Sequence, residues 1–115
     1  MKRDDLLYLQ NIFDAVLRID SYVQGLDRES FAQNLLVQDG VIRQIMIMGE
    51  AAKLLSNELR DRYAQVPWRQ MARMRDLLIH RYFGVDLDEV WSTSQNDIPP
   101  LKLKIAVIIK ELKDD

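Results

Sequence analysis

Apolar residues recur along the chain with the three- and four-residue spacing of amphipathic helices, and no segment shows the sustained period-two alternation of a half-buried strand. A first stripe, with Asp4 or Asp5 near its start as a cap, comprises Leu6, Leu9, Phe13, Val16 and Val23. A second stripe begins after Asp27 and comprises Phe31, Leu35, Ile42, Ile45, Gly49, Ala52 and Leu59. It predicts one long helix that is central to a bundle or part of an oligomer interface. The position of Gly49 on this stripe predicts a close approach by a neighbouring helix.

The remaining helices are marked by prolines, glycines and caps. A third helix is predicted to start near Pro67 and to end at Gly84. A short fourth helix starts at Asp86, with Glu89 in a capping-box arrangement. The last helix is indicated by Asn96-Asp97 and Pro99-Pro100, and its inner stripe is Leu101, Ile105, Ile108 and Leu112. The sequence therefore predicts one all-α domain over residues 1–115, a bundle of about five helices joined by short loops.

Length and composition narrow the class of protein. A chain of 115 residues is near the modal size of a single domain. The absence of cysteine removes disulfides, thiolate nucleophiles and thiolate metal sites, and it fits a reducing compartment. No apolar run approaches the roughly 20 residues of a membrane span, and the first residues do not open a signal peptide. We expect a soluble cytoplasmic protein with no membrane association.

Charge is distributed unevenly, although the net charge is only −2. Between positions 60 and 81 there are two acids, Asp61 and Asp76, and six arginines, which are Arg60, Arg62, Arg69, Arg73, Arg75 and Arg81. The only histidine of the chain, His80, lies inside this block. Such a local basic field attracts a phosphate-bearing ligand, and the alternative interpretation is a solvated helix face.

The third helix carries the candidate chemistry. Its stripe is Trp68, Met71, Arg75, Leu78 and Tyr82, so an arginine interrupts an apolar face. A partly buried guanidinium needs a carboxylate or an anionic ligand, and Glu50 is a candidate carboxylate. An Arg75–Glu50 pair that only holds two helices in register is the structural alternative. Asp76 lies four residues before His80 and is placed to accept a hydrogen bond that fixes the histidine tautomer.

The pattern Arg-x4-His-x-Tyr, formed by Arg75, His80 and Tyr82, resembles the catalytic motif of the HEPN superfamily, specifically of the HepT-like toxins. The polar Asp76 directly after the arginine fits that motif. The similarity extends through 47-IMGEAAKLLS-56, 65-QVPWRQMARMRDLLIHRYFGVD-86, 87-LDEVW-91 and 97-DIPPLK-102. Several blocks in the same order cover nearly the whole chain.

This resemblance implies a HEPN-like, symmetric homodimer that cuts RNA without a metal or other cofactor. It implies a toxin of a type VII-like toxin–antitoxin system, in which Arg75 and His80 are catalytic and Asp76 orients. It further implies that a minimal nucleotidyltransferase antitoxin inactivates the toxin by adding AMP to Tyr82. The basic field around the motif adds Arg73 and Arg81 as candidate RNA-binding residues.

The chemistry of RNA cleavage is consistent with these residues. Transesterification needs a base for the 2'-OH, an acid for the leaving oxygen and positive charge at the phosphorus. One histidine does not easily supply both proton transfers, whereas a two-fold dimer would bring His80 and Arg75 of both chains into one cleft. No metal site is expected, because Asp86, Asp88 and Glu89 are better explained as a helix start.

Three other interpretations remain open at this point. The first is a non-catalytic helical module that binds RNA or a nucleotide, or that docks a nucleotidyltransferase. The second is a purely structural helical dimer. The third concerns Tyr82 alone, which is an ordinary stacking or core aromatic at such a stripe position.

Overall fold

The computed structural model describes residues 4–114, except for the side chain of Tyr82. Within that range it contains helices and turns but no strand. The elements are α1 (Asp5–Val23), α2 (Arg28–Ala32), α3 (Leu35–Leu54), α4 (Asn57–Arg62), α5 (Trp68–His80), the 3-10 turn η1 (Tyr82–Gly84), α6 (Leu87–Ser92), the π-helical η2 (Thr93–Asp97) and α7 (Ile98–Asp114). The predicted all-α class is therefore confirmed.

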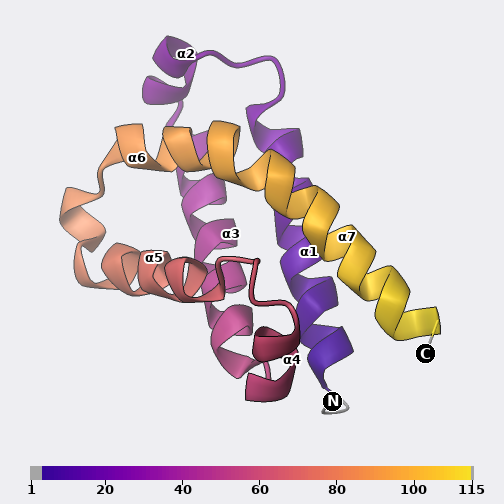
Figure 1. Cartoon of the computed structure of the whole chain (residues 1–115). Helices are drawn as coiled ribbons and strands as arrows, with labels where there is room; N and C mark the ends of the chain where they lie inside the picture. The colour runs from indigo at the N-terminus through magenta and orange to yellow at the C-terminus, as the bar shows by residue number, and fades with distance from the viewer. Residues whose placement is uncertain (1–3, 115) are drawn as a thin grey trace.

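Helix α3 forms the centre of the bundle, because it packs against both α1 and α5 (Figure 1). Helix α7 runs beside α1, and the short α2 and α4 lie at opposite ends of α3. Fully buried side chains on three helices form the core, among them Leu9, Ile12, Val16, Val41, Ile105 and Ile108. Leu9, Val16, Ile105 and Ile108 belong to the predicted stripes, whereas Ile12 does not, and Leu35 of the second stripe is 74% exposed. The apolar periodicity therefore located the core only in part.

The prediction of one long helix after Asp27 is wrong, because α2, α3 and α4 are separate. Asp27 begins α2 with a reciprocal capping box to Ser30. The Asn34 side chain accepts a hydrogen bond from the backbone N–H of Val37 and starts α3. Ser56 does the same for Leu59 and starts α4. Each side chain satisfies an N–H group that a helix start leaves without an intrahelical partner, which stabilises the interruptions.

A buried carboxylate joins the start of α1 to the junction between α3 and α4. Asp5 is only 2% exposed, and its Oδ1 accepts a hydrogen bond of 2.8 Å from the backbone N–H of Ser56. The Ser56 hydroxyl donates a second bond of 2.6 Å to Oδ2 of Asp5. The cap position of α1 is Asp4, whose side chain makes no capping hydrogen bond. Asp5 therefore links the start of α1 to the junction between α3 and α4.

The third predicted helix also ends earlier than expected, since α5 stops at His80 instead of continuing to Gly84. After Arg81 the backbone forms the 3-10 turn η1, in which the N–H of Gly84 donates to the carbonyl oxygen of Arg81 at 2.8 Å. Gly84 does not adopt a left-handed conformation; among the described residues only Gly25 has a positive φ. Consequently, His80 lies at the end of the α-helix, while Tyr82 lies in the following 3-10 turn.

The end of the chain is one nearly continuous helical run, where short loops were predicted. Asp86 caps α6 by accepting hydrogen bonds from the N–H groups of Asp88 and Glu89. The π-helical η2 then connects α6 directly to α7, as the orange and yellow ribbon shows (Figure 1). Pro99 and Pro100 lie in the first turn of α7, directly after η2. Of the helices within residues 4–114, none has the length and apolarity required to cross a bilayer.

Candidate functional site

The candidate site begins with the contact between α3 and α5. A Cβ atom at Gly49 would overlap the Cβ atom of Arg75 and would lie 2.7 Å from the carbonyl oxygen of Met71. The predicted close approach at Gly49 is therefore confirmed. Because α5 packs directly on this glycine, the Arg75 side chain lies against α3 beside Glu50.

Four charged side chains from these two helices form the ionic cluster, which we define as Glu50, Lys53, Arg75 and Asp76. Nη2 of Arg75 lies 3.2 Å from Oε2 of Glu50, which confirms the predicted ion pair. Nη1 of Arg75 lies 3.0 Å from Oδ1 of Asp76. Nζ of Lys53 donates to that same oxygen at 2.6 Å. Two cations and two carboxylates thus meet at the surface between α3 and α5.

The two cations affect the ionisation of Asp76. The hydrogen bond from Lys53 lowers the pKa of this carboxyl below its ordinary value of 3.8, and the hydrogen bond from Arg75 lowers the pKa further. Both donors favour the charged form of the carboxyl group. Asp76 is consequently a carboxylate throughout the neutral pH range, and it holds both cations by charge-assisted hydrogen bonds.

An open groove of about 710 Å³ runs beside the ionic cluster between α3 and the end of α5. Arg75 and Glu50 line it together with apolar side chains that include Ile42, Met46 and Ile79. Ile79 is 40% exposed, and the lining residue Phe83 is fully exposed. A charged site therefore borders an exposed apolar surface, which is a common feature of association surfaces.

His80 lies close to this groove in sequence but is not part of the ionic cluster. It is the last residue of α5, and its side chain is exposed. Five residues of helix separate it from Arg75, so the two side chains leave the helix about 140° apart. Among the described residues, the hydrogen bonds to the Asp76 carboxylate come from Lys53 and Arg75, and none comes from His80. The orienting role of Asp76 stays a prediction.

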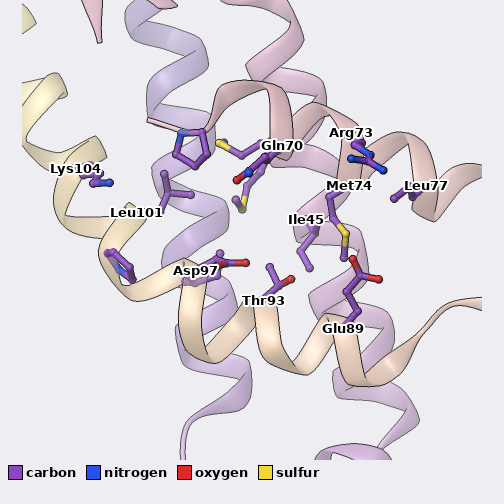
Figure 2. A pocket seen from close by; sticks show the side chains of 15 residues that line it. Ile45, Gln70, Arg73, Met74, Leu77, Glu89, Thr93, Asp97, Leu101 and Lys104 are labelled. Carbon is purple, nitrogen blue, oxygen red and sulfur yellow. The ribbon is translucent and has the colours of Figure 1, made fainter. Parts of the chain in front are cut away.

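The flanking arginines occupy different surroundings. Arg73 lines a second cavity of about 490 Å³, which lies between α5 and the run from α6 to α7 (Figure 2). Figure 2 shows Met74 reaching from α5 into this space toward Glu89. Arg73 and Arg75 thus line two different hollows, whereas Arg81 is exposed directly after His80. The side chain of Tyr82 lies outside the described part of the structure.

Lys53 is the member of the ionic cluster that sequence reasoning missed. It lies three residues after Glu50 and four after Gly49, so the helical period of α3 places all three near one face. That spacing was a usable signal once Glu50 and Gly49 had been assigned to the contact with α5. Within residues 4–114, no group of three or more potential ligand side chains is arranged to hold a metal ion.

The structure is thus an all-α bundle with a charged site between its two central helices. A family model described as "Ribonuclease HepT-like" matches residues 12–108, which is most of the chain. The chain belongs to the HepT-like ribonuclease family. The resemblance inferred from the sequence motifs is therefore confirmed.

Individual relatives support the same assignment. The chain is 42% identical over 110 residues to a protein of Thermococcus cleftensis named "Probable ribonuclease HepT", covering 96% of this chain and 100% of that protein. It is also 42% identical over 112 residues to a protein of Methanocaldococcus jannaschii named "Gamma-glutamylcyclotransferase and putative RNase". That match covers 97% of this chain but only 50% of the relative, so the chain spans half the length of that protein. No solved structure matches this chain.

Proposed function

We propose that this protein is a metal-independent endoribonuclease in which Arg75 and His80 carry the chemistry. Membership of the HepT-like ribonuclease family supports the reaction class. The observation that carries the assignment of residues is their position on α5. Arg75 is held at the edge of a groove, and the only histidine of the chain is exposed at the end of the same helix.

The residue types match the steps of RNA transesterification. A neutral imidazole takes the proton of the 2'-OH, the 2'-oxygen attacks phosphorus, and the bond to the 5'-oxygen breaks. A protonated imidazole then gives its proton to the leaving 5'-oxygen, which leaves a 2',3'-cyclic phosphate. Arg75 supplies paired N–H donors to the phosphate oxygens as negative charge develops on them. Arg81, and Arg73 along a longer path, bind flanking phosphates.

The active form in this proposal is a symmetric homodimer. One chain offers one imidazole, so a second copy is needed to supply both a base and an acid from histidine. The apolar lining of the groove beside Arg75, with the exposed Ile79, suits burial against a second copy. A two-fold axis at this surface would bring both histidines and both arginines to one cleft.

We extend the proposal to regulation. The protein acts as the toxin of a type VII-like toxin–antitoxin system, and a minimal nucleotidyltransferase antitoxin adds AMP to Tyr82. The backbone of Tyr82 lies in η1, two residues beyond His80, which is near the proposed cleft. A nucleotide attached there would add negative charge close to the arginines and would obstruct the entry of RNA. A mass increase of one AMP on Tyr82, after incubation with the cognate nucleotidyltransferase and ATP, would support this extension.

Cleavage of total cellular RNA in EDTA is the direct test of the proposed activity. Purified wild type is compared with His80→Ala and Arg75→Ala, and Arg18→Ala on α1 is a matched control for the loss of an exposed arginine. We expect cleavage and cyclic-phosphate ends from wild type and Arg18→Ala alone. Full cleavage by either active-site variant, or cleavage only when a divalent metal is added, would refute the assignment.

A non-catalytic binding module is the second candidate, and the ionic cluster favours it. Two cations that converge on one carboxylate oxygen can bind an anion without any contribution from His80. This candidate predicts RNA binding that is lost in Arg75→Ala and kept in His80→Ala, with no cleavage by the unmodified wild-type dimer. The same set of variants therefore separates the two functions.

A further inference from the structure

We propose that Lys53 is a second phosphate-binding residue, and that the carboxylate of Asp76 occupies, in the free protein, the position taken by a phosphate oxygen of RNA. This inference rests on the proposed function and extends its site to a residue on α3. It concerns the contacts made before and during RNA binding, and it leaves the proton transfers with His80.

The geometry around one oxygen atom carries the inference. Oδ1 of Asp76 accepts from Nζ of Lys53 at 2.6 Å and from Nη1 of Arg75 at 3.0 Å. The two donors come from different helices, yet they point to the same place. Convergent Lys and Arg donors at these distances are the arrangement that binds a phosphate oxygen.

The register between the two helices fixes this convergence. Gly49 seats α5 against α3 at Arg75. Lys53 follows Gly49 by four residues, so it lies one turn further along the same face of α3. Lys53 and Arg75 are thus held together by the backbone contact, and they do not need Asp76 to bring them near each other.

Charge and exposure make an exchange with RNA feasible. The ionic cluster contains two cations and two carboxylates, so it is balanced in the free protein. A phosphodiester carries one negative charge, as Asp76 does, and it preserves this balance when it replaces that carboxylate. The side chains of Lys53 and Asp76 are 38% and 43% exposed, so RNA can reach them from solvent. The Asp76 carboxylate needs only to rotate outward.

Binding of a short single-stranded DNA oligonucleotide tests the inference apart from cleavage, because DNA lacks the 2'-OH. We compare Lys53→Met with Lys110→Met, a matched loss of an exposed lysine on α7. Lys53→Met should weaken binding about tenfold. It should also make the slope of the logarithm of affinity against the logarithm of salt concentration shallower by about 0.7. Lys53→Arg should restore most of the affinity. Equal binding by Lys53→Met and wild type, with both folded by circular dichroism, would overturn the inference.

Asp76→Asn separates phosphate binding from a purely structural ion pair. If Asp76 competes with phosphate, the Asp76→Asn variant binds the oligonucleotide as tightly as wild type or more tightly. If the ionic cluster only holds the helices together, oligonucleotide binding falls in both Asp76→Asn and Lys53→Met. A weaker complex with Asp76→Asn would therefore contradict the exchange that we propose.

The outcomes also distinguish this inference from the proposed function. If the wild type cleaves RNA, His80→Ala does not, and Lys53→Met has the same KM as wild type, the protein is a nuclease and Lys53 is not part of its site. Oligonucleotide binding that requires Lys53, with no RNA cleavage by wild type, would keep the phosphate site and remove the nuclease.

Discussion

Gly49 on α3 lies against Arg75 on α5 so closely that no side chain larger than hydrogen fits between the two backbones. The obstacle is not a flexible side-chain end, because it consists of the Cβ atom of Arg75 and the backbone carbonyl of Met71. One contact therefore sets both the packing of the two central helices and the position of the candidate phosphate-binding arginine.

The first prediction concerns Gly49→Ala. In an open helix this change would stabilise the protein by about 1 kcal/mol, since alanine is the better helix former. Here the overlap forces the helices apart, and we expect a net loss of about 1–3 kcal/mol in the free energy of unfolding. Urea denaturation measures it. Gly84→Ala is the control, because a Cβ atom there would meet nothing within 4 Å. Equal stability of the two variants would contradict the close contact.

The second prediction concerns the buried bond between Asp5 and Ser56. In Asp5→Asn, an amide replaces the carboxylate that accepts two hydrogen bonds of 2.8 and 2.6 Å in a buried position. We expect the free energy of unfolding to fall by about 2 kcal/mol, because a buried donor loses a charged acceptor. The exposed neighbour provides the control variant, Asp4→Asn, which should change stability little. A change of similar size in both variants would indicate a general charge effect at the start of α1.

Sequence patterns predicted the features that depend on one helix and its neighbours in the chain. The stripes located much of the core, Gly49 indicated a close helix contact, and an arginine on an apolar face predicted Glu50 as its partner. The motif around His80 indicated the family. The family was indicated by resemblance, whereas the other features follow from a local physical requirement, such as helical period or the need of a partly buried charge for a partner.

The features that were missed depend on competition between local and tertiary interactions. The apolar stripe continues through Asn34 and Ser56, so periodicity alone predicts an uninterrupted helix, yet both residues cap new helices. Ser56 is additionally held by Asp5, which is 51 residues away in sequence. Lys53 and Asp76 are separated by 23 residues, and their pairing follows only from the register of α3 and α5. The pattern within α3 places Lys53 near Gly49 and Glu50, but it does not identify Asp76 as the partner of Lys53.

The third prediction concerns the pH dependence of stability. The pKa of Asp76 is below its ordinary value of 3.8, so the contribution of this carboxylate is present above that value. It is lost as the pH falls through the lower pKa of the folded state, where the carboxyl group takes up a proton. Asp76→Asn should therefore be less stable than wild type at neutral pH, and the difference should shrink below pH 3.8. Chemical denaturation across pH 2–7 measures both proteins.

The control for this experiment is Asp61→Asn, which removes an exposed acid on α4. Its stability relative to wild type should not follow the titration of Asp76. A difference between Asp76→Asn and wild type that stays constant to the lowest pH would mean that the ion pairs with Lys53 and Arg75 contribute nothing to stability.

The fourth prediction tests whether two copies of His80 act in one cleft. When wild type and His80→Ala are mixed in equal amounts and subunits exchange freely, about one quarter of the dimers contain two wild-type chains. If both imidazoles are needed, RNA cleavage per wild-type chain should fall to about half, and an excess of the variant should suppress it further. The same mixture assayed immediately after mixing, before subunits exchange, controls for competition for RNA, because it contains the same amounts of both proteins. Activity that stays proportional to the amount of wild type would show that each chain acts alone, and the shared-cleft mechanism would then be wrong even if the protein is a nuclease.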